Sequence, residues 1–138
     1  MTKRINRDKM YMEVAKVIAK RGTCTRLKVG AIIVNNGGII SEGYVGAPKG
    51  MPHCEDGCGD NGGCKDTVHA EINAIIKAAK NGVSVNGGVM YCTHSPCKAC
   101  AMAIINSGIG ELMFETAYRD AEPIKMLERA GIYVGFVS

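Results

Sequence analysis

The 138-residue chain has no tryptophan and few other aromatic side chains, namely two phenylalanines and five tyrosines. Proteins that modify a base of tRNA or DNA need aromatic side chains to stack the flipped base and a basic face to hold the backbone. The formal net charge of +4 is mild, and it fits an anionic small molecule as well as an ordinary charged surface. We therefore expect no nucleic-acid partner.

Long apolar runs are also missing from the sequence. No segment approaches the ~20 apolar residues that span a bilayer. The basic stretch 1–9 is not followed by the apolar segment of a signal peptide. We expect a cytoplasmic protein with no membrane contact, folded as one domain over residues 1–138.

Helix-type and strand-type apolar periodicities alternate along the chain. Two β-branched runs flank a turn at 35–38 and predict an antiparallel hairpin. The alternation that follows predicts an α/β fold, with a central five-stranded mixed sheet covered by helices. The expected helices are 8–21, 68–81, 97–106 and 121–130, and the expected strands are 29–34, 39–45, 89–93, 112–115 and 132–137.

The first two expected helices carry recognisable apolar stripes. In 8–21 the stripe predicted to be buried comprises Met10, Val14, Val17 and Ile18. In 68–81 the predicted buried face consists of several alanines with Ile72, Ile75 and Ile76.

Cysteine usage points to metal or thiol chemistry. An odd number of cysteines in a chain without a signal peptide argues against a disulfide framework. One group is Cys97 and Cys100, and a second lies in a glycine-rich insert at about 46–66 that has few apolar residues. The seven cysteines are Cys24, Cys54, Cys58, Cys64, Cys92, Cys97 and Cys100.

The motifs His69-Ala70-Glu71 and Pro96-Cys97-Lys98-Ala99-Cys100 carry the chemistry, and each is expected in the first turn of a helix. A catalytic zinc takes three protein ligands and leaves a fourth position for water. H-x-E followed by P-C-x-x-C is the pattern of zinc deaminases, in which the glutamate moves protons and does not bind the metal. This assigns His69, Cys97 and Cys100 as ligands and Glu71 as the catalytic residue.

A structural zinc site is the alternative for the same residues. It would need a fourth protein ligand, such as Cys92 or Cys64. The carboxylate two residues after His69 favours the catalytic interpretation.

The chain resembles deoxycytidylate (dCMP) deaminases over nearly its whole length. The resemblance rests on the two metal motifs and on the segments 24–31, 41–50 and 53–64. It implies the cytidine-deaminase-like three-layer α/β/α fold and hydrolysis of dCMP to dUMP and ammonia, which supplies dTMP synthesis. It also implies a homohexamer activated by dCTP and inhibited by dTTP, with Mg²⁺ accompanying the triphosphate.

The resemblance further implies a second, structural zinc in the insert. Four ligands would close a tetrahedral site, and which four is left open. Reduced surface thiols are the alternative. The available ligands are Cys24, His53, Cys54, Cys58 and Cys64.

Substrate and effector contacts are expected around the metal motifs and the segments that carry the resemblance. The family usually has Gly-Tyr-Asn-Gly where this chain reads Gly43-Tyr44-Val45-Gly46, and Val45 cannot form the hydrogen bonds of an asparagine. The phosphate is expected near cationic side chains, for which Arg26, Lys28, Lys49 and Arg119 are candidates. The expected contact residues are Arg26, Tyr44, Lys49, Ala70, His94, Ser95 and Tyr118.

Three other functions compete with dCMP deamination. A nucleoside deaminase would use the same zinc and Glu71, but the insert and the Arg26 segment disfavour it. A nucleic-acid cytidine or adenosine deaminase is disfavoured by the scarcity of aromatic residues. A catalytically silent, zinc-stabilised nucleotide-binding module would bind nucleotide without turnover, but the sequence keeps Glu71 and the ligands.

Overall fold

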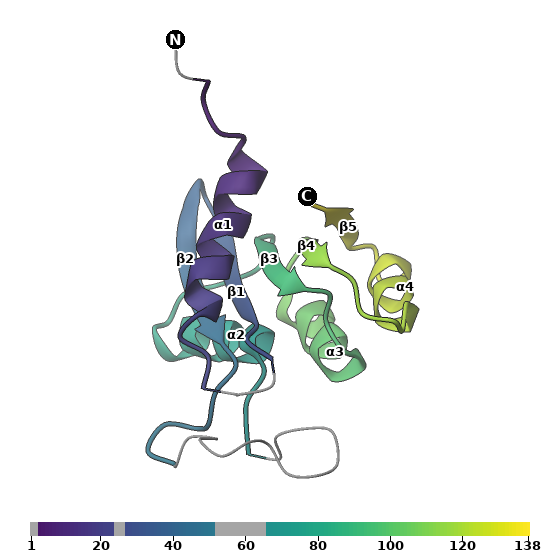
Figure 1. The fold of residues 1–138 in the computed structure, drawn as a ribbon. Coiled ribbons are helices and arrows are strands. Elements are labelled where there is room, and N and C mark those ends of the chain that lie inside the picture. The colour runs from purple at the N-terminus through teal and green to yellow at the C-terminus, as the bar shows by residue number, and fades with distance from the viewer. Residues whose placement is uncertain (1–2, 24–26, 52–65) are drawn as a thin grey trace.

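The computed structural model describes residues 3–23, 27–51 and 66–138 (Figure 1). The element order agrees with the order predicted from the sequence, and most boundaries shift by one or two residues. The elements are α1 Arg7–Ala19, β1 Gly30–Asn35, β2 Gly38–Tyr44, α2 Ala70–Lys80, β3 Val89–His94, α3 Lys98–Ser107, β4 Glu111–Thr116, α4 Glu122–Arg129 and β5 Tyr133–Phe136.

The five strands form one mixed sheet in the order β2-β1-β3-β4-β5. Strand β1 pairs antiparallel with both β2 and β3, whereas β3, β4 and β5 are parallel neighbours. The predicted hairpin is therefore confirmed. Because β2 and β3 both run opposite to β1, the carboxyl ends of four strands meet at one edge of the sheet. That edge carries Tyr44, His94 and Thr116, the last residues of β2, β3 and β4.

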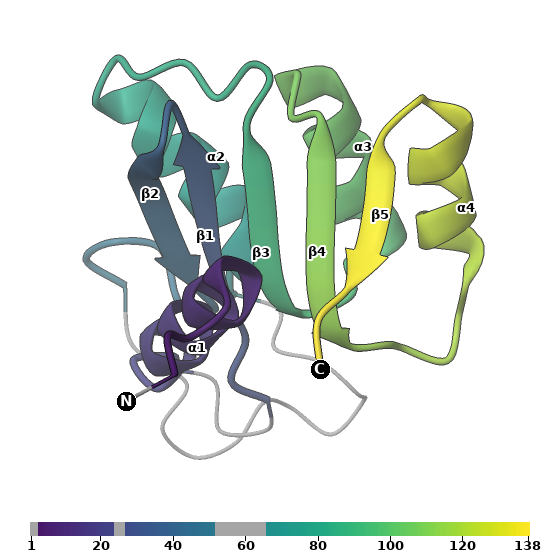
Figure 2. The same cartoon turned by 90° about the horizontal axis from the view of Figure 1, so that it is seen from above.

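Helices cover both faces of the sheet, which confirms the predicted three-layer α/β/α fold (Figure 2). Helix α1 packs on one face, where Met12 and Ala15 meet Ile32 of β1 and Tyr91 of β3. The other face packs against α2, α3 and α4 in the larger apolar cluster. Among the described residues, no helix is long and apolar enough to cross a membrane.

The buried face of α1 agrees in part with the predicted stripe, because Val14 and Ile18 pack against the core. Met10 and Val17 are exposed, while Tyr11 and Ala15 are buried. Small residues decide this face, because a Cβ added to Gly30 of β1 would lie 2.2 Å from the backbone oxygen of Ala15. The α1 backbone therefore approaches β1 closely beside Ala15 and Ala19.

Helix α2 also approaches a strand closely at its small residues. Ala70, Ala74 and Ala78 are buried and Ile75 packs against the core as predicted, but Ile76 is 53% exposed. A Cβ added to Gly43 of β2 would lie 2.3 Å from the Ala70 oxygen and 2.5 Å from the Ala74 nitrogen. This close approach turns the alanines inward, and it fixes the beginning of α2 against the end of β2.

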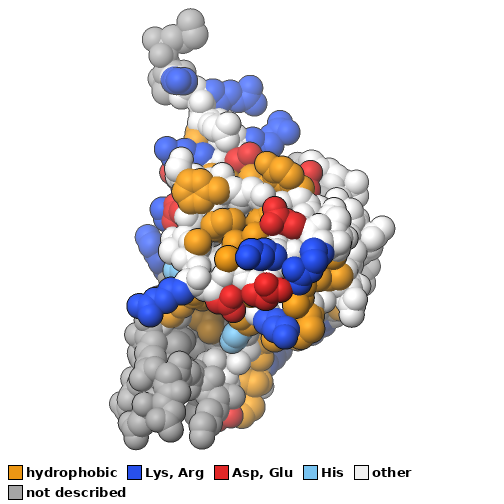
Figure 3. Space-filling model, turned by 90° about the vertical axis from the view of Figure 1, so that its right-hand side faces the viewer, with side chains coloured by type: hydrophobic (Ala, Val, Ile, Leu, Met, Phe, Trp, Pro, Cys, Tyr) orange, Lys and Arg blue, Asp and Glu red, His pale blue; other side chains and the backbone are white. Residues whose placement is uncertain are grey.

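Acidic and basic side chains are interspersed on the face that looks out from the α4 side of the molecule (Figure 3). No broad field of positive charge covers the described part of that face.

Candidate metal centre

Three side chains converge at the sheet edge where the strands end. The Nδ1 atom of His69 lies 3.3 Å from the Cys100 sulfur and 3.5 Å from the Cys97 sulfur. All three ligand atoms lie within 4.8 Å of one another. The structure thus brings together the two predicted motifs, which are separated in the sequence by the whole of β3.

The spacing of these atoms fits a tetrahedral zinc ion. Zinc bonds of about 2.0–2.1 Å to nitrogen and about 2.3 Å to sulfur place the two ligand atoms about 3.5 Å apart. The two observed nitrogen–sulfur distances, 3.3 and 3.5 Å, are close to that value. The donor set, one imidazole and two thiols, is also one that zinc prefers.

Within the described residues the cluster holds three ligands and no fourth. Cys92 is fully buried in the apolar cluster of the sheet and is not part of the group. It is therefore not the fourth ligand of a structural site, and Cys64 lies outside the described residues. Three protein ligands are the number that a catalytic zinc uses.

His69 and Cys97 are the N-cap residues of their helices, just before the first turns in which they were predicted. His69 precedes α2 and Cys97 precedes α3, each with an extended backbone. Neither side chain caps its own helix. Each is therefore free to turn towards the other, and Cys100 completes the group from the first turn of α3.

Burial controls the ionisation of Cys100. Desolvation and then the neighbouring charge of Glu71 raise the pKa of its thiol. A cation beside this thiol would favour the thiolate, so metal binding there is coupled to loss of the thiol proton.

Glu71 lies on the first turn of α2 and is only 4% exposed. Burial raises its pKa to about 7, and a hydrogen bond to its own backbone partly opposes the shift. Near neutral pH this carboxyl group can both accept and release a proton, as a general acid/base must.

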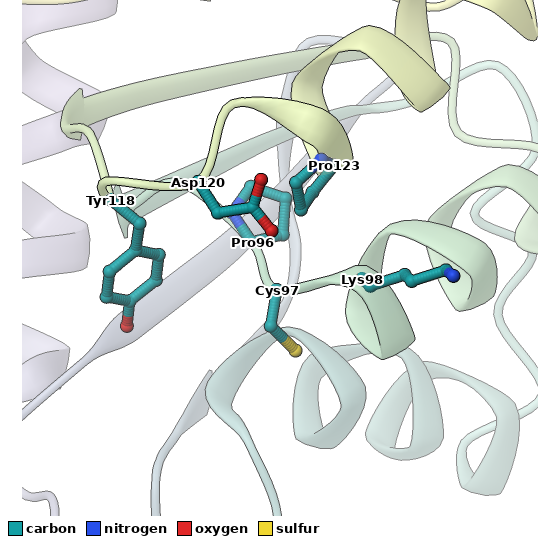
Figure 4. Close-up of a pocket in the computed structure, with 6 residues that line it drawn as sticks. All are labelled: Pro96, Cys97, Lys98, Tyr118, Asp120 and Pro123. Carbon is teal, nitrogen blue, oxygen red and sulfur yellow. The ribbon is translucent and has the colours of Figure 1, made fainter.

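A cavity of about 210 Å³ opens beside Cys97, between the beginnings of α3 and α4. Its walls include Pro96, Tyr118 and Asp120, and Figure 4 shows the Tyr118 ring and the Cys97 sulfur directed to the same side. Lys98 also lines the cavity but extends away from Tyr118 (Figure 4). Asp120 further accepts a hydrogen bond from the Glu122 backbone, which opens α4.

His94, Ser95 and Tyr118, three of the predicted contact residues, form one unit. The His94 and Tyr118 rings stack with centroids 5.8 Å apart and planes inclined by 28°. The Tyr118 backbone N–H donates to Ser95 Oγ at 2.9 Å. Burial lowers the pKa of His94 against the opposing charge of Glu115, and burial raises the pKa of Tyr118 to about 12.

Tyr44 and Lys49 line a separate groove of about 490 Å³ beside β2 and α2. Lys77 and Lys80 add positive charge to its wall, although Lys77 forms an ion pair with Glu42. Val45 is buried, and its backbone carbonyl accepts the Thr23 N–H. The side chain at the position that departs from the family pattern therefore packs inside the protein.

The other predicted contacts fall in different places. Ala70 is buried in the core, and only 1% of the residue is exposed. Lys28 and Arg119 are exposed. The remaining predicted residues lie outside the described part of the chain, namely Cys24, Arg26, His53, Cys54, Cys58 and Cys64.

Sequence reasoning missed two polar residues near the centre. Asn73 donates to the Tyr44 carbonyl at 2.8 Å and to the Val68 carbonyl at 3.3 Å, which ties the end of β2 to the entry of α2. Thr93 is buried, and its Oγ1 atom forms a hydrogen bond with His94 Nδ1. In the sequence, the signal for Asn73 and Thr93 is a polar side chain within an otherwise apolar helix face or strand.

Solved structures identify the class of protein that this fold and site define. The structure of dCMP deaminase from the cyanophage S-TIM5, in complex with dCMP and dUMP, is similar with a TM-score of 0.87. The two sequences are 33% identical, and the similarity covers 97% of this chain and 100% of the other. The fold is therefore the cytidine-deaminase-like α/β fold.

Residues 5–116 match the family model for the cytidine and deoxycytidylate deaminase zinc-binding region, and the chain belongs to that family. ComE operon protein 2 of Bacillus subtilis is 39% identical over 95% of this chain and 71% of its own length. Deoxycytidylate deaminase of Saccharomyces cerevisiae is 35% identical over 92% of this chain. The match spans 43% of the yeast enzyme's length.

Proposed function

We propose that this protein is a zinc-dependent hydrolase that converts dCMP to dUMP and ammonia and so supplies dTMP synthesis. The observation that carries the proposal is the three-ligand cluster of His69, Cys97 and Cys100 beside the buried Glu71. The similarity to an enzyme whose structure holds dCMP and dUMP supports the choice of substrate.

The residues divide the chemistry between them. His69, Cys97 and Cys100 would hold the zinc, which when bound supplies a Lewis acid that lowers the pKa of water to about 7. Glu71 takes a proton from the attacking water, delivers it to the ring nitrogen and then helps to protonate the leaving amine. Water adds at C4, the bond from C4 to the amino nitrogen breaks, and uracil remains on the nucleotide.

The nucleotide is expected to lie along the sheet edge beside the metal ligands. His94, Ser95, Tyr118 and the Ala70 backbone border this region, and the phosphate would meet cationic side chains. Arg26, Lys28 and Arg119 are the candidates for that contact.

Steady-state deamination of dCMP, deoxycytidine and CMP by the zinc-loaded protein tests the proposal. Turnover of dCMP with a clear preference over the other two is the expected result. Preference for deoxycytidine would identify a nucleoside deaminase instead. Absence of turnover on all three would favour a nucleic-acid deaminase or a silent binding module.

We further propose the regulation that the family resemblance implies, with dCTP as activator and dTTP as inhibitor, each accompanied by Mg²⁺. The groove that contains Tyr44 and Lys49 supports an anionic effector, because Lys77 and Lys80 also line it. Assays with each triphosphate should change the dCMP dependence in opposite directions. Identical kinetics with and without them would remove the regulation and leave the enzyme activity standing.

A homohexamer, a cytoplasmic location and the single-domain organisation over residues 1–138 belong to the same proposal. So does a second, structural zinc held by four of the five Cys and His residues at positions 24 and 53–64. Light scattering coupled to size-exclusion chromatography measures the assembly state directly.

A further inference from the structure

Thr93 and His94 close the carboxyl end of β3, directly before the loop that delivers Cys97. Alternate residues of a strand face opposite sides of the sheet, so His94 shares the side of Met90 and Cys92. Those two residues pack with α2 and α3, the helices that present the metal ligands. The imidazole therefore stands on the metal side of the sheet edge.

The hydroxyl of Thr93 connects this imidazole to β1. The Gly30 backbone N–H donates to Thr93 Oγ1 at 3.2 Å, and Oγ1 lies 2.9 Å from His94 Nδ1. Gly30 packs closely against α1, since a Cβ there would lie 2.2 Å from the Ala15 oxygen. The Thr93 oxygen therefore accepts from a donor on a closely packed strand.

The direction of the second hydrogen bond follows from burial. Thr93 is 5% exposed, and a buried hydroxyl proton needs an acceptor. Within the described residues, His94 Nδ1 is the acceptor that the structure offers it. The Thr93 O–H therefore donates to Nδ1, and a neutral imidazole then carries its proton on Nε2.

The second ring nitrogen of His94 is Nε2. No described residue forms a hydrogen bond with His94 Nε2, and no buried side-chain nitrogen or oxygen of the described residues lacks a partner. Among the described residues, Nε2 thus has no hydrogen-bond partner and is not a buried unsatisfied atom. The ring is held in place by stacking on Tyr118, which lines the cavity beside Cys97.

We propose that Thr93 is a positioning residue that fixes His94 as the Nε2–H tautomer, so that His94 presents a hydrogen-bond donor to the nucleotide beside the metal ligands. This rests on the proposed dCMP deamination and adds to it the origin of one substrate contact. The acceptor would be an oxygen of the pyrimidine nucleotide, because an N–H group recognises an oxygen lone pair.

The tautomer can be measured without turnover. Nitrogen NMR of the zinc-loaded protein labelled on histidine distinguishes a protonated from an unprotonated ring nitrogen, and His94→Phe assigns the His94 signals. We expect His94 to carry its proton on Nε2 in the wild type and in Thr93→Ser, which keeps the hydroxyl. Thr93→Val, which has the same shape without the hydroxyl, should lose this preference. A proton on Nδ1 in the wild type would overturn the proposal.

Steady-state kinetics test whether the tautomer of His94 affects the KM for dCMP. Loss of one hydrogen bond predicts a KM for dCMP about three- to tenfold higher in Thr93→Val and His94→Phe, with a smaller change in kcat. Thr93→Ser should restore the wild-type KM. In the His94→Phe background, Thr93→Val should have no further effect on KM.

The outcomes separate two kinds of failure. If Thr93→Val raises KM equally with and without the histidine, Thr93 acts through something other than His94 and the proposal is wrong. If the wild type does not deaminate dCMP, the proposed function fails, and the tautomer measurement still decides the role of Thr93.

Discussion

Glu71 has surroundings that suit the proton transfer proposed for it. The carboxyl group is almost fully buried, and desolvation raises its pKa to about 7. It stands two residues after His69, on the same helical turn that begins beside the metal ligands. Its protonation therefore changes in the pH range where a nucleotide deaminase would operate.

Replacing Glu71 by glutamine should separate catalysis from folding. The amide keeps the shape of the side chain but cannot exchange a proton, so kcat for dCMP should fall by about 10²- to 10⁴-fold. Zinc content and the urea unfolding midpoint are the controls, and both should remain close to wild type. Turnover near the wild-type rate would show that another group moves the protons.

The three cysteines of the described region have different expected roles. Cys97→Ser should reduce the zinc bound per chain, because it removes one of three ligands at the cluster. Cys92→Ala is the matched control, since Cys92 is buried outside the cluster. Metal analysis after dialysis should show loss of zinc in the first variant only. Equal loss in both would indicate a general effect on the fold.

At the scale of elements, the site depends on how closely helices approach strands. Gly43 lets the backbone of α2 come against β2, and Gly30 lets α1 come against β1. These contacts place alanines inward and fix the direction in which α2 begins. The position of His69 and Glu71 is therefore a consequence of a glycine on a neighbouring strand.

Gly43→Ala tests this dependence. The added methyl group would meet the α2 backbone at 2.3 and 2.5 Å, so the helix must shift. Overpacking of this kind typically costs about 1–3 kcal/mol, and zinc binding should weaken with it. Gly38→Ala is the control, because no atom lies within 4 Å of its added Cβ. Equal urea midpoints for the two variants would contradict the close-packing account.

The same contacts explain what the sequence could and could not predict. Element order and the metal motifs were accessible because periodicity and ligand spacing are local signals. The buried face of α1 was predicted only at Val14 and Ile18. Met10 and Val17 are exposed because the close approach to Gly30 turns the Ala15 side of the helix to the sheet. The pairing of His94 with Tyr118 was also hidden, since it needs β3 and β4 to lie in register.

For the whole molecule, a metal count distinguishes one zinc from two. If the insert holds a structural zinc, the wild type should bind two zinc ions per chain and Cys54→Ser one. The variant should melt at a lower temperature, because metal binding contributes folding free energy directly. Cys97→Ser provides the comparison, since it should lose the other ion. One zinc in the wild type and unchanged melting of Cys54→Ser would argue against the second site.

The separation of the two metal motifs along the chain has a consequence for assembly of the fold. His69 stands before α2 and Cys97 before α3, with β3 between them and paired to β1 and β4. We expect the cluster to close only after that central strand has paired with its neighbours. Zinc uptake during refolding should therefore follow sheet formation and not helix formation, which makes the metal a late reporter of a completed core.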